Sequence, residues 1–224
     1  MVRTQPLIEG RCAVIPHETA KRIERALCGR YGVLLTHKTG ALWAAVSAVF
    51  DVAKALGAGV PSGASFTHEF ATTIGVVVCL PDAQLSDDEM TALLVHECTH
   101  ASQFVREPGK MAVQYIQHRE RRAVLEAEAY AQGAAILWLL TGQVPQRVED
   151  MASALQWGYA LTAEDCALAW GLLEQYATSI VAGVLPEGPC RVAAAIMARE
   201  CPEVLNAEAL ALVRLNCPEA LEAA

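Results

Sequence analysis

The chain has 224 residues and a mass of 24.0 kDa, with 54% hydrophobic residues and a mean hydropathy of +0.28. This composition argues against an intrinsically disordered chain and leaves enough apolar residues for a folded core. The formal net charge of −8 and the pI of about 5.3 argue against a nucleic-acid-binding protein, which would need a basic surface.

The N-terminal third alternates between helix-like and strand-like segments. Residues 17–28 form an amphipathic pattern that predicts a helix ending at Gly29. Residues 41–56 form a second helical pattern, and its apolar stretch Ala41–Phe50 is expected to belong to the core. Strands are expected where β-branched and aromatic residues gather. These segments are residues 32–36, Phe66–Thr73 and Gly75–Leu80.

The rest of the chain is predicted to be helical. Ser86 and Glu89 are spaced as in a capping box, which predicts a helix from there to about Val105. After a break at residues 106–110, a long helical pattern continues to Leu140. Further helices are expected at residues 162–184, 190–200 and 206–215. We expect a boundary within Val144–Ala154, which divides the chain into a domain of residues 1–143 and a helical extension of residues 144–224 packed on it.

The eight cysteines and the N-terminus bear on the compartment. None of the cysteines is spaced as Cys-x-x-Cys, so a zinc ribbon or a thioredoxin-type redox pair is not indicated. Met1–Pro6 lacks the apolar segment of a signal peptide, and no apolar run reaches the about 20 residues of a membrane span. We therefore expect a cytoplasmic protein with reduced thiols and no membrane association.

The most informative motif lies on the capped helix and reads His96-Glu97-Cys98-Thr99-His100. Residues four apart share one face of a helix, so His96 and His100 can bind one metal ion. Glu97 is turned by about 100° from His96 and can reach a water molecule on that ion. It is therefore the candidate general base, because the metal lowers the pKa of the water and the carboxylate takes its proton.

A hydrolytic zinc site needs a third protein ligand and an open position. The metzincin pattern is excluded, because Gln103 and Arg106 stand at its Gly and His positions. Glu126 and Glu128 on the next long helix are the main candidates. They lie about 200° apart around that helix, so only one of them can face the metal. His118 is a further alternative within a highly charged stretch.

These motifs resemble the gluzincin branch of zinc metallopeptidases. Residues His96–Gln103 read H-E-x-x-H-x-x-Q and residues Glu126–Tyr130 read E-x-E-A-Y, which is similar to small bacterial and phage HExxH proteins. The resemblance covers Gly75 to about Leu140. It implies an α+β, zincin-like fold, in which a small N-terminal sheet lies over the active-site helix and the C-terminal part is mostly helical.

The resemblance also implies one zinc ion per chain. Glu126 followed two residues later by Glu128 and then Ala129 matches the gluzincin pattern E-x-x-[SA], with Glu126 as the ligand beside the two histidines. Tyr130 stands where the family often has an aspartate, so the usual carboxylate partner of a zinc-bound histidine is missing from that position.

The expected activity is hydrolysis of peptide bonds in a peptide or protein substrate. Zinc polarises the scissile carbonyl, and Glu97 acts as the general base and then passes the proton to the leaving amine. An extended substrate can pair with the edge of one of the two strands that precede the active-site helix. The candidate partners of the substrate or of the oxyanion are Tyr115, Tyr130, Tyr159 and Gln103.

Two other functions fit the same sequence. A zincin-shaped binding or assembly protein would hold a structural zinc ion and meet a protein partner through its C-terminal helices, and the Tyr130 departure favours this alternative. A purely helical scaffold would bind no metal. The sequence shows no specificity pocket that would indicate a substrate.

Overall fold

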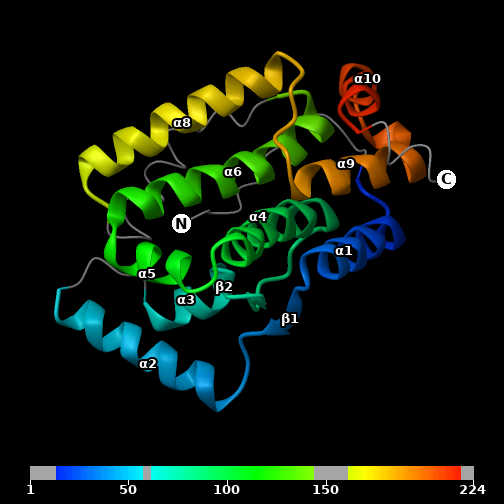
Figure 1. The fold of residues 1–224 in the computed structure, drawn as a ribbon. Coiled ribbons are helices and arrows are strands. Elements are labelled where there is room, and N and C mark those ends of the chain that lie inside the picture. Colours follow the sequence, from blue (N-terminus) through cyan, green and yellow to red (C-terminus); the bar gives the residue numbers. More distant parts are fainter. Residues whose placement is uncertain (1–13, 58–61, 144–160, 218–224) are drawn as a thin grey trace.

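The structure is a computed structural model that describes residues 14–57, 62–143 and 161–217. It is mostly helical with one small three-stranded sheet, as expected for an α+β chain (Figure 1). The elements in chain order are α1 (His17–Tyr31), β1 (Leu34–His37), α2 (Ala41–Ala55), α3 (Gly63–Glu69), β2 (Thr72–Ile74), β3 (Val77–Leu80), α4 (Asp87–Arg106), α5 (Lys110–Gln117), α6 (Arg119–Thr141), α8 (Ala163–Val181), α9 (Pro189–Glu200), the 3-10 helix η1 (Pro202–Val204) and α10 (Ala207–Asn216).

The sheet has the strand order β1-β3-β2, with β1 parallel and β2 antiparallel to the central strand β3. Gly75 has a φ of 64° in the tight turn between β2 and β3, a conformation that glycine adopts without a steric cost. Val78 of β3 is fully buried in the core that the sheet shares with α4. The strand order makes β2 an edge strand, whereas β3, the other strand considered for pairing with a substrate, is the central strand.

Helix α4 lies at the centre of the molecule and packs against α1, α6 and α9 (Figure 1). The main hydrophobic core joins apolar side chains from these four helices, for example Ile23, Val95, Ile136 and Met197. Helix α8 packs along α6 over a second, smaller cluster. The C-terminal helices thus share a core with the helices of the motif, while the expected boundary at 144–154 lies outside the described residues.

Helix α6 is the one helix in the described parts of the chain that is long and apolar enough to cross a membrane. In this protein 67% of its most apolar window is buried against other elements. A core helix of a soluble protein passes the same test, and the packing of α6 between α4 and α8 accounts for its composition.

The expected strand at Phe66–Thr73 is wrong over most of its length. Ser62 caps α3 by accepting a hydrogen bond from Ser65 N, so the chain is helical as far as Glu69. The Phe66 ring stacks on Phe50 of α2 at 4.1 Å between centroids. This tertiary contact and the cap outweigh the strand preference of the aromatic residues, and β2 begins only at Thr72.

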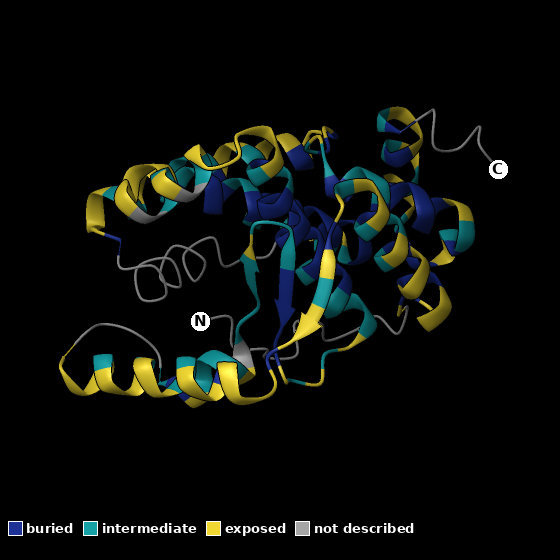
Figure 2. Cartoon of the chain, turned by 60° about the horizontal axis from the view of Figure 1, so that its bottom comes forward, coloured by how far each residue is buried: buried dark blue, intermediate teal, exposed yellow. Residues whose placement is uncertain are grey.

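The expected burial of Ala41–Phe50 is also wrong. Trp43 is the one described α2 residue that is buried, whereas Leu42, Val49 and Val52 are between 60% and 71% exposed. Most of α2 has the colour of exposed residues in Figure 2. The main contact of α2 is with the short helix α3, which covers only one side of it. Apolar composition therefore did not indicate burial here.

Several helix boundaries differ from the expected ones, and α8 ends at Val181 rather than at residue 184. Helix α1 continues through Gly29 to Tyr31 and ends at Gly32, whose φ of 65° provides the left-handed cap. The long helical pattern after Lys110 is divided into α5 and α6, because His118 has extended dihedral angles (φ −114°, ψ 100°).

The seven cysteines in the described ranges are free thiols, and five of them are buried.

Candidate metal centre

Helix α4 presents both histidines of the motif to one point. Its first turn has the expected capping box, in which Ser86 accepts a hydrogen bond from Glu89 N and the Glu89 carboxylate accepts one from Ser86 N. One turn of helix separates His96 from His100, and their Nε2 atoms lie 3.2 Å apart. Two ring nitrogens at this distance need a proton or a cation between them.

Glu126 of α6 completes the group. Its Oε1 lies 3.4 Å from His100 Nε2, and its Oε2 lies 3.7 Å from His96 Nε2. Ligands bound tetrahedrally at about 2.0–2.1 Å are separated by about 3.3 Å, so the spacing fits a metal site. The side chains are buried, with exposed fractions of 9% for His96, 7% for His100 and 0% for Glu126. These three residues could hold a metal ion, and two imidazoles with one carboxylate suit zinc and similar divalent ions.

Gly133 explains how α6 comes so close to α4 at this point. A Cβ atom at residue 133 would lie 3.2 Å from the backbone oxygen of Ala92 and 3.8 Å from His96 Cβ. Glycine at position 133 therefore allows α6 to approach α4 closely beside His96. The sequence signal was available, since an isolated glycine inside a helical pattern often has a packing reason.

The electrostatics of the group also favour a cation. Burial lowers the pKa of His96, and the neighbouring His100 lowers it further. Burial also lowers the pKa of His100, but the Glu126 carboxylate outweighs this effect and raises that pKa to about 9. Burial raises the pKa of Glu126, whereas the two imidazoles lower it to below its usual value. Glu126 Oε2 is buried without a hydrogen-bond partner among the described residues, which is the environment that a metal ion would satisfy.

Further contacts fix the three side chains. His100 Nδ1 lies 2.9 Å from Gln103 Oε1, and the backbone of Ala129 hydrogen-bonds His96. The hydroxyl of Tyr115 donates a hydrogen bond to Glu126 Oε1. The ring of Tyr130 meets the His96 ring edge to face at 4.7 Å between centroids. Tyr115 and Tyr130 thus both contact members of the group.

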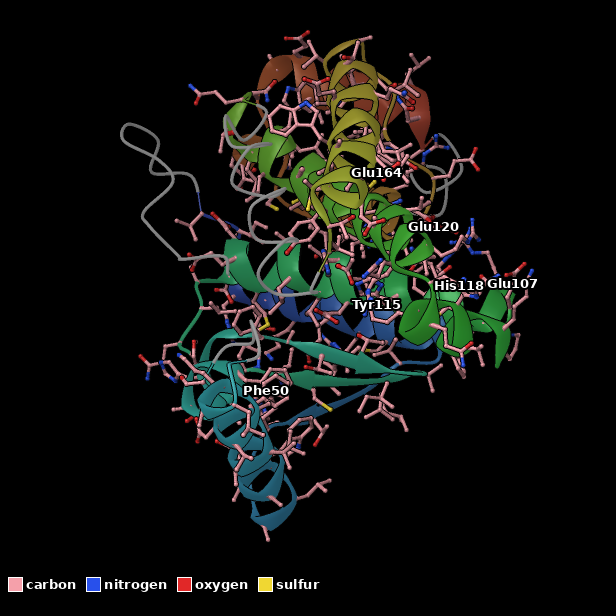
Figure 3. All side chains as sticks on the ribbon, turned by 90° about the vertical axis from the view of Figure 1, so that its left-hand side faces the viewer. Phe50, Glu107, Tyr115, His118, Glu120 and Glu164 are labelled. Carbon is pink, nitrogen blue, oxygen red and sulfur yellow. The ribbon has the colours of Figure 1, made fainter. Side chains whose placement is uncertain are left out.

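The alternative ligands lie elsewhere. Glu128 is directed away from the group and accepts hydrogen bonds from Arg106 at 2.9 Å and from Gln103 at 3.0 Å. His118 is exposed at the start of α6. In Figure 3 its label lies farther from the middle of the molecule than that of Tyr115. Tyr159 lies outside the described residues.

Glu97 is directed toward the edge of the sheet. It is 5% exposed, and the Thr73 hydroxyl of β2 donates a hydrogen bond of 2.5 Å to its Oε2. Thr73 was not recognised in the sequence, where its only signal was a place in an expected strand. The negative charge of Glu97 acts to raise the pKa of both His96 and His100, although burial still lowers the pKa of His96 overall. Glu97 therefore interacts electrostatically with both candidate ligands.

Lys38 is a second residue that the sequence did not indicate. Its Nζ donates to the backbone oxygen of Phe66 at 3.2 Å and lies 3.6 Å from the centroid of the Phe66 ring. Burial lowers its pKa to about 8, although the charge of Glu97 acts in the opposite direction. Lys38 therefore contacts Trp43 of α2 and Phe66 of α3 and also interacts electrostatically with Glu97.

Comparison with protein-family models, with curated proteins and with solved structures finds no match to this chain. A function must therefore be inferred from the geometry of these side chains.

Proposed function

We propose that the chain is a zinc metallopeptidase with a zincin-like fold, which hydrolyses peptide bonds in a peptide or protein substrate. The observation that carries the proposal is the buried group of His96, His100 and Glu126, with Glu97 next to the first of them. Within the described ranges this group has three members, and a hydrolytic zinc site has three protein ligands and an open position. A structural zinc site would have four protein ligands.

The roles of the residues follow from their positions. Zinc held by His96, His100 and Glu126 would supply Lewis acidity and would lower the pKa of water toward about 7. Glu97 accepts the proton of the attacking water and returns it to the leaving nitrogen. The hydroxyl of Tyr115, which lies against Glu126, is the candidate donor to the oxyanion. Tyr130 packs on His96 and holds its ring.

The sheet offers a place for an extended substrate. β2 is an edge strand, and its residue Thr73 contacts Glu97. A peptide that adds to this edge by backbone hydrogen bonds would lie beside the general base. This arrangement, with the sheet edge next to the motif helix, supports the zincin-like interpretation of the fold.

A second candidate function is a binding or assembly protein that holds zinc for structural reasons. The low exposure of the ligands, 0% to 9%, favours it, because closed sites are typical of structural metals. A fourth protein ligand would be required, and a protein partner would meet the C-terminal helices.

The test combines zinc content with hydrolysis of fluorescein-labelled casein. We expect one zinc per chain in the wild type and in Glu97→Gln, with hydrolysis reduced by about 10²–10⁴-fold in that variant. Equal hydrolysis by the wild type and Glu97→Gln would overturn the mechanism. One tightly bound zinc with no hydrolysis by the wild type would favour the assembly protein.

The third ligand is tested by a matched pair on one helix. Glu126→Ala should lose zinc, whereas Glu128→Ala and His118→Ala should still bind one zinc per chain when zinc is in excess, because their side chains lie outside the group. Loss of zinc in Glu128→Ala alone would contradict the assignment.

A further inference from the structure

Gln103 is a buried polar residue that joins a candidate ligand to the protein surface. Its side chain is 3% exposed and lies one helical turn beyond His100 on α4. The amide nitrogen donates two hydrogen bonds, one to Leu125 O at 3.0 Å and one to Glu128 Oε2 at 3.0 Å. Glu128 in turn accepts a hydrogen bond from the exposed Arg106 at 2.9 Å.

These bonds determine which way the amide faces. A backbone carbonyl and a carboxylate can only accept, so the Gln103 atom that they contact must be the NH2 group. The amide oxygen is then the atom 2.9 Å from His100 Nδ1. Because this oxygen can only accept, Nδ1 must carry a hydrogen, and the free electron pair of the neutral ring is on Nε2. Nε2 is the atom that faces Glu126.

We propose that Gln103 is a positioning residue, which holds His100 in the tautomer and ring orientation that bind a divalent ion, and that the Glu128–Arg106 ion pair fixes the orientation of the Gln103 amide. The inference rests on the proposed metal site and extends it to the residues behind the ligand. Position 130 faces His96, whose hydrogen-bond partner is the backbone of Ala129, so the acceptor from Gln103 serves His100 alone.

The chemistry of the acceptor has a measurable consequence. A neutral amide accepts a weaker hydrogen bond than a carboxylate does, so it makes the imidazole less basic. Partners of this kind behind a metal ligand typically change metal affinity by about 10–100-fold. Exchanging the two side chains, as in the double variant Gln103→Glu with Glu128→Gln, places a carboxylate on His100 and keeps a hydrogen bond between positions 103 and 128, but it removes the donor to Leu125 O.

The experiment measures the zinc dissociation constant by competition with a chromophoric chelator. The proteins are the wild type, Gln103→Leu, the exchange variant and the control Gln132→Leu. Gln132 is also a buried glutamine, with hydrogen bonds to Glu187 O at 2.7 Å and from Cys190 N at 2.9 Å, and no hydrogen bond to a candidate ligand. Circular dichroism establishes the folded fraction, and affinities are compared per folded chain.

We expect Gln103→Leu to bind zinc about 10–100-fold more weakly than the wild type, and the exchange variant to bind at least tenfold more tightly than Gln103→Leu. Gln132→Leu should lose stability but keep the wild-type affinity. The positioning role would be overturned if the wild type and Gln103→Leu bound zinc with equal affinity. It would also be overturned if Gln132→Leu lost as much zinc affinity as Gln103→Leu. Should Gln103→Leu fail to fold, Gln103→Met takes its place, because methionine keeps the length of the side chain and lacks the amide; wild-type zinc affinity in Gln103→Met would overturn the positioning role.

Casein hydrolysis separates this inference from the proposed function. If the affinities follow the expected order and no protein hydrolyses casein, the positioning role stands and the peptidase proposal fails. If hydrolysis depends on Glu97 while Gln103→Leu binds zinc as the wild type does, the peptidase proposal stands and the positioning role fails.

Discussion

The hydroxyl of Thr73 on the edge strand donates a 2.5 Å hydrogen bond to Glu97 Oε2 on the motif helix. These residues are 24 positions apart in the sequence, and the contact joins the edge of the sheet to the proposed general base. The direction of the Glu97 carboxylate therefore depends on where β2 lies. A substrate that pairs with β2 would meet a base that the same strand has oriented.

Replacing Thr73 by valine tests this contact, because valine keeps the branched shape and removes the hydroxyl. We expect casein hydrolysis to fall by about 10–150-fold, since a hydrogen bond to a charged group contributes about 1.5–3 kcal/mol. Zinc affinity should be unchanged, because Thr73 does not contact the three ligands. Thr73→Ser should retain most of the activity, and full activity in Thr73→Val would show that the contact is dispensable.

Metal binding should release a proton at neutral pH. Burial lowers the pKa of His100, but Glu126 raises it to about 9, so the ring is protonated at pH 7 in the metal-free protein. A bound metal displaces the Nε2 proton. Calorimetry in buffers of different ionisation enthalpy should show about one proton released per zinc at pH 7 and almost none above about pH 10.

The same raised pKa predicts the pH dependence of affinity and of stability. Zinc affinity should rise by up to about tenfold per pH unit below pH 9, and an affinity that is constant between about pH 6.5 and 8.5 would contradict the pairing of His100 with Glu126. In the metal-free protein, the contribution of protonated His100 to stability is complete below its unfolded pKa of about 6.5 and is lost as the pH rises through about 9.

Gly133 offers a stability test with a matched control. Gly171 lies within α8, and a Cβ atom there meets nothing within 4 Å, so Gly171→Ala should stabilise the protein by about 0.8–1 kcal/mol through helix propensity alone. Gly133→Ala should lose this gain, because the new methyl group would press on Ala92 O at 3.2 Å. Urea unfolding should separate the two variants by at least about 1 kcal/mol, and equal gains would show that α6 has room to move at that position.

The parts of the site that the sequence predicted are local. The capping box and the i, i+4 spacing of His96 and His100 lie within one helix, and helical geometry alone brings the rings together. The choice between Glu126 and Glu128 depends on the rotation of α6 relative to α4, which is a tertiary property. Two residues 200° apart on a helix are equivalent candidates until the partner helix is in place.

The failures of sequence interpretation have the same physical origin. Phe66 has a strand-forming side chain, but a cap at Ser62 and stacking on Phe50 place it in a helix. The apolar pattern of α2 is typical of a core helix, and yet little of the described chain covers it. Thr73 acquires its role only when β2 meets α4, so no local pattern could indicate it.

Lys38 should oppose folding below pH 8. Burial lowers its pKa to about 8 in the folded protein, against 10.5 in the unfolded chain. Between these values the unfolded chain binds more protons, so the contribution of Lys38 to stability rises as the pH rises from about 8 to 10.5. Lys38→Met should therefore raise the free energy of unfolding at pH 7 by about 1–3 kcal/mol.

The comparison is made by urea unfolding of the metal-free wild type and Lys38→Met across this range of pH. The advantage of the variant should shrink toward pH 10.5. A variant that is less stable at pH 7 would show that the hydrogen bond to Phe66 O and the ring contacts outweigh the burial of the charge.

The most direct measurement is zinc K-edge X-ray absorption on the wild-type protein loaded with one equivalent of zinc. It tests whether His96, His100 and Glu126 bind one ion that keeps an open position. We predict two imidazole ligands at about 2.0–2.1 Å, oxygen ligands that include one water, and no sulfur. Sulfur scattering at about 2.3 Å from cysteine, or four protein ligands around the ion, would contradict the proposed catalytic zinc site.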